Sequence, residues 1–564
     1  MTETADSYVC GIADAPLLGE TIGHALDQAA RRWGKREALV SPSHDVRWTW
    51  QELAERVDAL AAGFLALGLE RGARIGVWSL NRPEWALTQF AAAKAGLVLV
   101  TINPAYRLSE LEFALAKVGC AALVTATAFK TSQYMEMLNT LLPELATAKP
   151  GQLQAARLPH LRAVIQIGGP ACPGTIAFDA VAGMGGARHR DELASLGKAL
   201  QFDDAVNIQF TSGTTGSPKG VTLTHHNILN NGYFVGRAMR LAETDRICIP
   251  VPLYHCFGMV MGNLAAVTSG AAMVYPGEGF DPLATLQTVE REKCTALYGV
   301  PTMFIAELDH PDFAKFDLKS LRTGIMAGAP CPIEVMRRVN EAMNMRDVTI
   351  AYGMTETSPV SFQSATDDPL ERRVSTVGRI HPHVEVKVID RDGRIVPRGE
   401  RGELCTRGYS VMLGYWDEPE KTAEVLDAAG WMHTGDIAII DAEGYCNIVG
   451  RIKDMVIRGG DNLYPREIEE YLYRHPKIQD VQIFGVADTR YGEELCAWIR
   501  VRPGETLTAD EVRSFCQGQI AHNKIPRYVE FVEEFPMTVT GKIQKFLMRD
   551  AVEAKLGLKA AKTA

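Results

Sequence analysis

The sequence predicts an α/β protein with a large N-terminal domain, residues 1–452, and a small C-terminal α+β domain, residues 453–564. Three observations support this prediction. Helical and strand patterns alternate from the N-terminus to about Tyr352, which favours largely parallel sheets covered by helices. Short alternating strands with hairpin turns begin near Val377 and indicate a β-rich subdomain. Beyond Lys453, a glycine pair and a helix opening near Pro465 introduce a mixture of strands and amphipathic helices.

Two α/β units precede the β-rich part. In the first 120 residues, apolar side chains recur at helical spacing over 53–65, and strands are expected at 74–78 and 97–102. The second unit has expected strands at 163–167, 206–210, 273–275, 295–298 and 348–352. Each strand leads toward a loop of Gly, Ser, Thr or Pro, and ligands of open α/β sheets bind at such loops. We therefore expect two doubly wound subdomains with chemistry at these loops.

The composition excludes several classes of protein. Lys and Arg number 59 against 68 Asp and Glu, so the net charge of −9 argues against nucleic acid as a partner. The eleven cysteines include no Cys-x-x-Cys pair, which indicates neither a disulfide framework nor a zinc knuckle. The first thirty residues contain no readable signal or transit peptide. The expected location is the reducing cytoplasm.

One uncharged stretch, residues 258–275, has the minimum length for crossing a membrane. It contains Asn263, Thr268, Ser269 and Gly270 and is followed by Pro276. These residues favour a buried helix, a turn and a core strand, so no integral membrane span is predicted.

The most informative segment is FTSGTTGSPKGVTLTH, residues 210–225. A strand leads into a loop of glycines and hydroxyl side chains, which can turn backbone N–H groups toward an anion, and Lys219 adds a positive charge. The spacing matches neither G-x-x-x-x-G-K-[ST] nor G-x-G-x-x-G. The loop is predicted to bind phosphate through Thr211, Ser212, Gly213, Thr214, Thr215, Gly216, Ser217, Pro218 and Lys219.

Across essentially its whole length the chain resembles the adenylate-forming superfamily of AMP-binding enzymes, which includes acyl-CoA synthetases, adenylation domains of peptide synthetases and firefly luciferase. The resemblance rests on long motifs in family order. They are TSGTTGSPKG at 211–220, PLYHCFG at 252–258, GAP at 328–330, YGMTET at 352–357, TGD at 434–436, GRIKDMVIRGG at 450–460 and PMTVTGKIQK at 536–545.

The resemblance implies ATP and Mg²⁺ as cofactors. Joining a carboxylate to the α-phosphate of ATP brings two anions together, so the site must neutralise charge. By resemblance, Glu356 matches the carboxylate that holds Mg²⁺, with Thr214 or Thr215 beside it. Asp436 matches the carboxylate that binds the ribose hydroxyls, and Arg451 matches a second contact to the ribose or to a phosphate. The walls of the adenine slot correspond to Gly328, Ala329, Pro330 and Tyr352.

Two further residues match catalytic positions of the superfamily. Lys542, in Thr540-Gly541-Lys542, corresponds to the lysine that bridges the carboxylate and the α-phosphate as negative charge accumulates. His255 corresponds to a position that lines the carboxylate site and moves between the two half-reactions. We assign it to positioning, because a carboxylate substrate is already ionised near neutral pH.

Several nucleophiles could attack the adenylate, so coenzyme A must be argued separately. The region 252–261 lacks the Asp that pairs the ammonium of amino-acid substrates in peptide synthetases. YGMTETSPV and RGGDNLYPREIEE look most like medium-chain acyl-CoA synthetases, and Gly459 and Gly460 correspond to the loop beside which pantetheine passes. Lys453 lies where the superfamily's mobile C-terminal lid rotates.

The sequence therefore indicates an acyl-CoA synthetase that converts a medium-chain fatty acid, ATP and CoA to acyl-CoA, AMP and pyrophosphate. Met259 is assigned to the acyl pocket, because an unbranched side chain adapts to different chain lengths. Two alternatives stay open: a CoA ligase for a short branched, sulfur-containing or aryl acid, and a non-catalytic CoA- or nucleotide-sensing relative. A homodimer is compatible with the sequence, which decides no oligomeric state.

Overall fold

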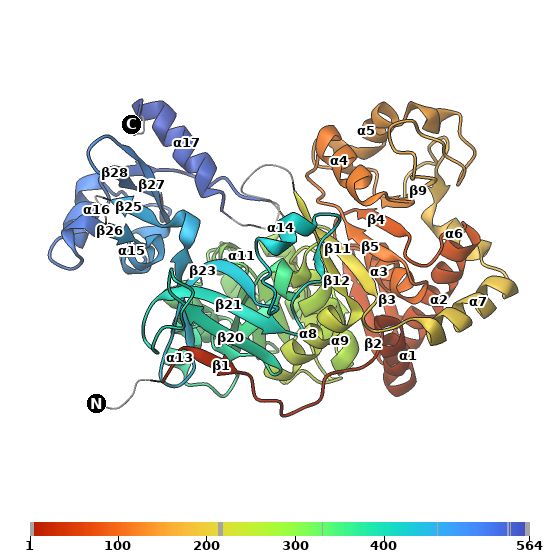
Figure 1. The fold of residues 1–564 in the computed structure, drawn as a ribbon, viewed down its shortest axis with the longest axis horizontal. Coiled ribbons are helices and arrows are strands. Elements are labelled where there is room, and N and C mark those ends of the chain that lie inside the picture. Colours follow the sequence, from red (N-terminus) through yellow and green to blue (C-terminus); the bar gives the residue numbers. More distant parts are fainter. Residues whose placement is uncertain are drawn as a thin grey trace.

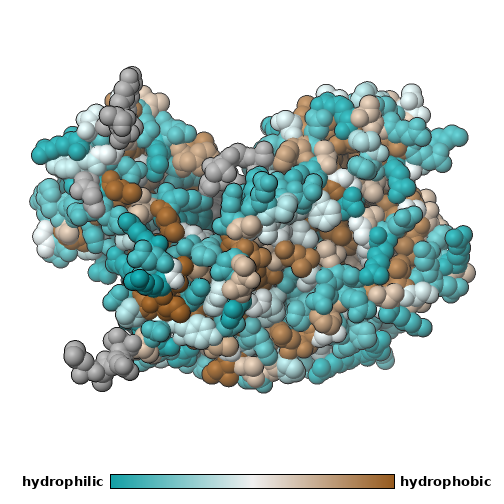
Figure 2. All heavy atoms as spheres, in the orientation of Figure 1, coloured by the Kyte–Doolittle hydropathy of each residue, from teal (hydrophilic) through white to brown (hydrophobic). Residues whose placement is uncertain are grey.

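The computed structural model describes residues 5–211, 218–329, 331–458, 461–538, 541 and 543–558. Figure 1 shows a large body, with β-strands and helices of the N-terminal domain, and a smaller lobe that carries the C-terminal elements β25 to α17. The space-filling view of Figure 2 shows the surface hollowed between this smaller lobe and the part of the body that carries α4 and α5. The predicted α/β class and its small C-terminal unit are confirmed.

The first sheet has eight strands and is parallel in its centre. Its order is β10-β9-β6-β4-β5-β11-β12-β22, with antiparallel pairing of β12 to both of its neighbours. The strands are β4 (Arg74–Trp78), β5 (Val98–Thr101), β6 (Ala122–Thr125), β9 (Ala163–Gln166), β10 (Ile176–Ala177), β11 (Ala205–Thr211), β12 (Lys219–Thr224) and β22 (Gly414–Tyr415).

Helices cover both faces of this sheet, because successive side chains along its strands point to opposite faces and are buried on both. Ile75 and Val77 of β4 pack into the cluster that contains α1, α2 and α3, whereas Trp78 and Val98 pack into the cluster under α4 and α5. The covering helices are α1 (Ile22–Trp33), α2 (Trp50–Ala66), α3 (Pro83–Lys94), α4 (Leu108–Val118), α5 (Tyr134–Leu141), α6 (Phe178–Met184) and α7 (Ala187–Ala199).

The second sheet has nine strands in the order β19-β18-β17-β16-β15-β13-β14-β2-β3. The strands are β2 (Glu37–Ser41), β3 (Val46–Thr49), β13 (Arg246–Cys248), β14 (Ala272–Val274), β15 (Ala296–Gly299), β16 (Thr323–Ala327), β17 (Asp347–Gly353), β18 (Val360–Gln363) and β19 (Arg379–Ile380). Its helices include α8 (His225–Ala238), α9 (Ala265–Ser269), α10 (Pro282–Glu292), α11 (Pro301–Leu308), α12 (Ile333–Ala342) and α13 (Leu370–Ser375).

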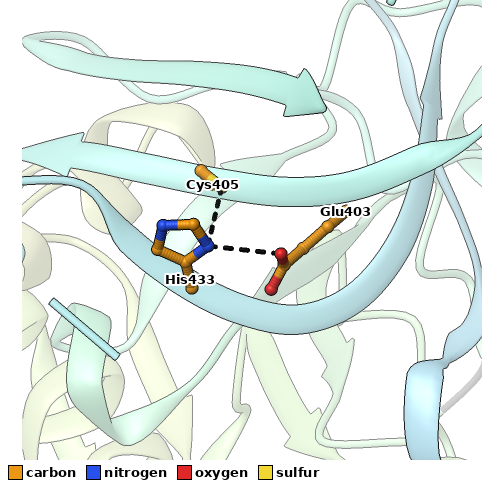
Figure 3. A group of neighbouring side chains, drawn as sticks. All are labelled: Glu403, Cys405 and His433. Carbon is orange, nitrogen blue, oxygen red and sulfur yellow. Dashed lines mark hydrogen bonds and ion pairs between the residues drawn. The ribbon is translucent and has the colours of Figure 1, made fainter. Parts of the chain in front are cut away.

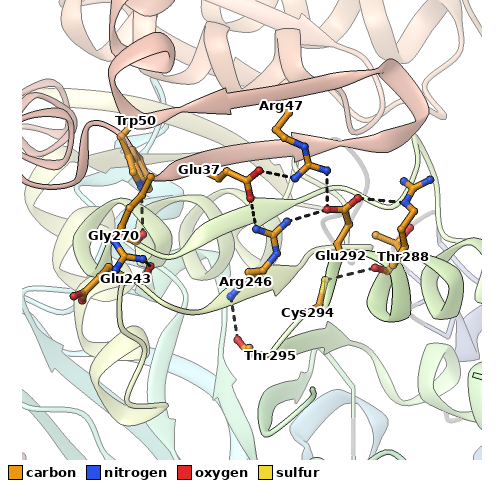
Figure 4. Close-up of polar contacts among 12 residues, drawn as sticks. Glu37, Arg47, Trp50, Glu243, Arg246, Gly270, Thr288, Glu292, Cys294 and Thr295 are labelled. Carbon is orange, nitrogen blue, oxygen red and sulfur yellow. Dashed lines mark hydrogen bonds and ion pairs between the residues drawn. The ribbon is translucent and has the colours of Figure 1, made fainter. Parts of the chain in front are cut away.

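The predicted grouping of strands into two units was wrong in two places. The strands expected at 163–167 and 206–210 are β9 and β11, which pair with β6 and β5 and so belong to the first sheet. The β2–β3 hairpin, within the first 120 residues, belongs to the second sheet. β2 pairs in parallel with β14 of the second sheet, so the chain begins its α/β region in one sheet and continues in the other. An ion network helps to fix the hairpin there (Figure 4): Glu37 on β2 contacts Arg47 on β3 and Arg246 on β13. Both arginines also donate to Glu292 Oε2, each over 2.9 Å.

Two five-stranded sheets complete the molecule. One has the order β1-β20-β21-β23-β24 and contains β1 (Tyr8–Cys10), β20 (Val384–Ile389), β21 (Gly402–Gly408), β23 (Met432–Ile440) and β24 (Cys446–Arg451). The other combines β25 (Val456–Arg458), β26 (Asp461–Leu463), β27 (Ile478–Asp488), β28 (Gly492–Val501) and β29 (Tyr528–Phe531). The chain passes between the two sheets at residues 452–455, and β7 (Ala128–Phe129) and β8 (Ser132–Gln133) form a separate hairpin.

The C-terminal sheet is covered by α15 (Pro465–Leu472), α16 (Ala509–Cys516) and α17 (Lys545–Leu556), whereas α14 (Pro419–Ala423) lies on the body. α16 begins with a reciprocal cap, because Thr508 Oγ1 accepts from Glu511 N–H and Glu511 accepts from Thr508 N–H. Among the described residues, no helix combines the length and apolar character needed to cross a bilayer.

The uncharged stretch 258–275 forms the expected buried helix, turn and strand, but the helix differs in kind. Phe257–Leu264 (η3) is π-helical and continues into α9. Gln89 Nε2 donates to the carbonyl of Met259 over 3.2 Å, and Tyr298 OH donates to that of Met261 over 3.0 Å. These side-chain donors satisfy carbonyls where the regular α-helical ladder is interrupted.

Candidate functional site

The β11–β12 hairpin carries the predicted phosphate loop. Thr211 and Lys219 are register partners at its end, and Pro218 precedes β12. The intervening residues of the prediction lie outside the described residues: Ser212, Gly213, Thr214, Thr215, Gly216 and Ser217. The ammonium group of Lys219 lies 4.7 Å from the centre of the Tyr415 ring, in reach of a cation–π contact.

Glu356 lies beside this hairpin on the short 3₁₀ turn Thr355–Thr357 (η5), and it is 7% exposed. Tyr415 OH donates to Glu356 Oε1 over 2.9 Å. The backbone carbonyl of Glu356 accepts from Met412 N–H, also over 2.9 Å. Burial, followed by the charge of Glu356, raises the pKa of Tyr415, so the phenol keeps its proton and acts as the donor.

Tyr415 thus joins two residues that the sequence analysis had singled out. Its hydroxyl holds the Glu356 carboxylate while its ring lies under the Lys219 ammonium. Sequence reasoning missed it, because a Gly-Tyr pair on a short strand carries no chemical signature. The contact appears only because β22 pairs with β12 at the edge of the first sheet.

A second cluster forms around Asp436, which is 6% exposed on β23. Arg451, its cross-strand partner on β24, donates from Nε to Oδ1 over 3.2 Å. Tyr352 at the end of β17 donates its hydroxyl to Oδ2 over 2.5 Å. Burial, followed by the Asp436 charge, raises the pKa of Tyr352. Within the described part of the chain, Tyr352 and Arg451 each donate to one oxygen of Asp436, and both oxygens keep lone pairs for a diol.

The adenine-slot candidates adjoin this cluster. Gly328 follows β16 with φ +85°, and a Cβ there would lie 3.2 Å from Val300 Cγ1. Ala329 is the next described residue, whereas Pro330 lies outside the described residues. The positive φ and the close neighbour together favour glycine at position 328.

The C-terminal domain reaches the same place. At Gly541, φ is +76°, and a Cβ would lie 3.0 Å from Val300 Cγ2 and 3.3 Å from Thr302 Oγ1. Met537 and Ile543 form an antiparallel bridge on either side of this glycine. Lys542 itself lies outside the described residues. Gly328 and Gly541 are far apart in the sequence, and both approach one side chain, Val300.

His255 and Met259 lie where η3 begins. The His255 ring stacks at a tilt on Tyr254, with 4.5 Å between ring centroids. Met259 is 1% exposed, and its Sδ lies 3.1 Å from Gln209 Nε2 on β11. Gln209 Oε1 also accepts from Cys256 N–H over 3.1 Å. β11 therefore anchors the segment that contains both predicted residues.

Lys453 lies in the 3₁₀ turn Ile452–Asp454 (η6), between β24 and β25. Partial desolvation, followed by the charge of Arg451, lowers the pKa of Lys453, whereas Asp454, Asp436 and Glu356 act in the opposite direction. The chain connection thus lies within electrostatic reach of both acidic clusters. Gly459 and Gly460, the predicted pantetheine loop, lie outside the described residues.

The donor set suits ATP with a hard cation. One oxygen of the Glu356 carboxylate, Oε1, accepts from Tyr415 OH. A carboxylate oxygen beside a hydroxyl-rich phosphate loop is the kind of ligand that Mg²⁺ shares with phosphates. The Asp436 cluster offers acceptors for ribose hydroxyls.

Family models match most of the chain. Residues 26–416 match the AMP-binding enzyme family, and residues 467–542 match the AMP-binding enzyme C-terminal domain. The mitochondrial medium-chain acyl-CoA ligase ACSF2 of Danio rerio is 50% identical over 557 residues, covering 98% of this chain and 91% of that protein. YngI of Bacillus subtilis (strain 168) is 48% identical over 537 residues, covering 95% and 98%.

Solved structures agree with these matches. The anthranilate CoA ligase AuaEII, in complex with anthranoyl-AMP, superposes with a TM-score of 0.83 at 26% identity, covering 97% of this chain and 99% of that one. ATP-bound MatB from Rhodopseudomonas palustris has a TM-score of 0.81 at 26% identity, covering 94% and 99%. The chain therefore belongs to the AMP-binding enzyme family.

Proposed function

We propose that this protein is an ATP-dependent acyl-CoA synthetase that activates a medium-chain fatty acid. The reaction has two steps: fatty acid and ATP give acyl-adenylate and pyrophosphate, and CoA then displaces AMP to give acyl-CoA. The observation that carries the proposal is the convergence at Val300 of Gly328, beside the nucleotide candidates, and Gly541, beside Lys542. Such a meeting is what adenylation requires, since an ammonium group must reach the reacting carboxylate and α-phosphate.

The substrate class rests on the relatives. ACSF2 of Danio rerio and of Homo sapiens, at 50% and 46% identity, are medium-chain acyl-CoA ligases, and each aligns with 98% of this chain. The structural neighbour AuaEII acts on anthranilate at 26% identity, so the aryl acids are the competing substrates. A non-catalytic relative is disfavoured, because Glu356, Asp436, Arg451 and Lys542 are all present.

Each assigned residue has a physical task in the first step. Asp436 and Arg451 bind and orient the ribose, and the hydroxyl loop 211–219 holds the β- and γ-phosphates. Glu356 Oε2, with Thr214, would hold Mg²⁺, which supplies positive charge to the phosphate oxygens when bound. Lys542 stabilises the negative charge that accumulates during attack, and His255 positions the carboxylate.

The second step requires the C-terminal domain to move. We place the domain boundary at Lys453, since the sheet containing β24 ends before it and the sheet containing β25 begins after it. Rotation there would carry Lys542 away from the nucleotide and bring Gly459 and Gly460 beside the pantetheine arm. Glycine at both positions leaves room for that thin arm.

We also propose a reducing compartment, with the cytoplasm as the simplest one. All eleven cysteines are free thiols. Exposed or partly exposed thiols such as Cys10 and Cys172 persist where glutathione and thioredoxin keep them reduced. The mitochondrial location of ACSF2 is a property of those relatives.

The chain-length profile tests the substrate class. Each buried methylene is worth about 0.8 kcal/mol, or roughly fourfold in kcat/KM, until the pocket is full. With straight-chain acids, kcat/KM should rise to a maximum at roughly four to twelve carbons. A maximum at acetate, a continued rise past palmitate, or a higher value for anthranilate would contradict the medium-chain assignment.

Lys542→Ala should abolish adenylate formation and spare thioester formation from supplied acyl-adenylate. Losing a preorganised charge contact costs roughly 3 to 4 kcal/mol, or about 10² to 10³ in rate. Pyrophosphate release and acyl-CoA formation are measured separately. Lys555→Ala, whose ammonium pairs with Glu530 at the surface, is the matched control and should change neither. Equal losses in both half-reactions would refute the role of Lys542.

Lys453→Pro should impair thioester formation far more than adenylation. Proline fixes φ near −65° and restricts the rotation that the second step needs. Lys453→Ala removes the charge but leaves φ free, so it separates the two effects. The comparison uses pyrophosphate release and single-turnover acyl transfer. A hinge at another position would be indicated if the proline variant lost both activities equally.

Tyr415→Phe should weaken the binding of Mg²⁺ that adenylation needs, and it should leave the fold unchanged. The variant removes one hydrogen bond to a carboxylate, worth roughly 1.5 kcal/mol or more, and keeps the ring under Lys219. The Mg²⁺ concentration for half-maximal pyrophosphate release should rise about tenfold. Tyr445→Phe is the control, because it also removes a hydrogen bond from a tyrosine to a carboxylate, that of Asp368. Tyr445 lies in the turn of the β23–β24 hairpin, away from Asp436, so this variant should have no such effect. An unchanged Mg²⁺ profile in Tyr415→Phe would show that Glu356 needs no such support.

A further inference from the structure

A second group of ligand-type side chains lies on the β subdomain, outside the residues assigned to the reaction (Figure 3). Cys405 on β21 and His433 on β23 are cross-strand register partners, and Glu403 lies two residues before Cys405. His433 Nδ1 lies 3.6 Å from Cys405 Sγ and 3.2 Å from Glu403 Oε2. One atom of each side chain therefore points into the same small volume.

The two separations from His433 Nδ1 are close to those of a tetrahedral zinc site, and all three ligand atoms lie within 4.8 Å of one another. Zinc binds sulfur at about 2.3 Å and nitrogen or oxygen at about 2.0 to 2.2 Å, which places neighbouring ligand atoms roughly 3.3 to 3.6 Å apart. The mixture of thiolate, imidazole and carboxylate also suits zinc and excludes magnesium, which prefers oxygen alone.

The surroundings favour metal binding. The His433 Nε2 atom lies 4.0 Å from Asp427 Oδ2, and a carboxylate facing the second ring nitrogen orients a metal-bound histidine. Asp427 is itself fixed, because its Oδ1 accepts from the N–H groups of Ala429 and Trp431. Glu403 Oε1 accepts from Gly435 N–H over 3.3 Å, which leaves Oε2 directed at His433.

Solvent can reach the group. The Cys405 side chain is buried, whereas those of Glu403 and His433 are 23% and 32% exposed, so solvent reaches one side of the group.

We propose that Glu403, Cys405 and His433 bind one Zn²⁺ ion through Oε2, Sγ and Nδ1, with water as the fourth ligand. On binding, the S–H proton of Cys405 leaves to solvent and a zinc–sulfur bond forms. The ring proton of neutral His433 then resides on Nε2, facing Asp427. The ion joins β21 to β23 three residues before Asp436, so it stabilises the strand pair that carries the proposed ribose-binding carboxylate.

The test uses cobalt as a spectroscopic substitute in full-length protein stripped of metal with a chelator. Cys10 and Cys172, the exposed and partly exposed thiols, are first replaced by serine to remove adventitious ligands. Titration with Co²⁺ should give a thiolate-to-cobalt charge-transfer band that saturates at one ion per chain and disappears when Zn²⁺ is added. Absence of this band in the parent protein would refute the site.

Three variants locate the site. Cys405→Ser should eliminate the charge-transfer band, whereas Cys446→Ser, a buried thiol on β24 of the same sheet, should retain it. Asp427→Asn should weaken zinc binding by about 10- to 100-fold, because it removes only the partner of the histidine. Equal zinc affinity in Cys405→Ser and its parent would overturn the proposal.

A measurement on the parent protein avoids any dependence on variant folding. In weakly buffered solution near neutral pH, Zn²⁺ should release one proton per chain from the Cys405 thiol, and calorimetry in buffers of different ionisation enthalpy measures that number. Binding without proton release would exclude a thiolate ligand. None of these measurements uses acyl-CoA formation, so failure of the zinc site leaves the proposed function unaffected.

Discussion

The candidate site depends on a network of buried amide side chains that joins the two α/β sheets. Gln209 on β11 accepts from Cys256 N–H and donates to Asn207, whose own amide donates to the carbonyl of Leu99 on β5. Gln89 on α3 joins Met259 and Asn263 of η3. Each bond contributes only about 1 kcal/mol net, but a buried amide left without a partner costs about 1 to 3 kcal/mol. The network therefore permits one relative placement of η3 and β11.

That placement brings separate sheets to one site. β11 leads into the phosphate-loop candidate, β17 leads to Glu356, and β23 carries Asp436. Each acidic residue is held by a tyrosine hydroxyl, Tyr415 for Glu356 and Tyr352 for Asp436, and burial keeps both phenols protonated. The two phenols are neutral and do not cancel the charge of the carboxylates that they hold. Arg451 pairs with Asp436 in addition, and the Asp436 oxygens keep lone pairs for hydroxyl groups of a nucleotide.

The same logic separates structural charges from functional ones. The network of Glu37, Arg47, Arg246 and Glu292 pairs two carboxylates with two guanidinium groups, and its contacts hold the β2–β3 hairpin to the second sheet (Figure 4). Its charges balance within the protein. Tyr415, which donates to Glu356, is a neutral phenol and does not cancel the negative charge of that carboxylate, as a cation site requires.

The sequence by itself determined the α/β class, the small C-terminal unit, the buried character of residues 258–275 and the motifs of the AMP-binding family. These properties are local: side-chain periodicity reports burial along one segment, and a motif needs only neighbouring residues. The predicted strand at 74–78 coincides with β4, and the helix near Pro465 is α15. The roles of the residues in those motifs stay predictions.

Only the tertiary structure decided which distant segments meet. The transfer of the β2–β3 hairpin to the second sheet, the π-helical form of η3 and the bond from Tyr415 to Glu356 were absent from the sequence analysis. Each depends on contacts between residues far apart in the chain, such as Tyr298 with Met261 or Gln89 with Met259. Such contacts override local preference, because the cost of an unsatisfied buried polar group exceeds the small energies by which single residues favour one helix type.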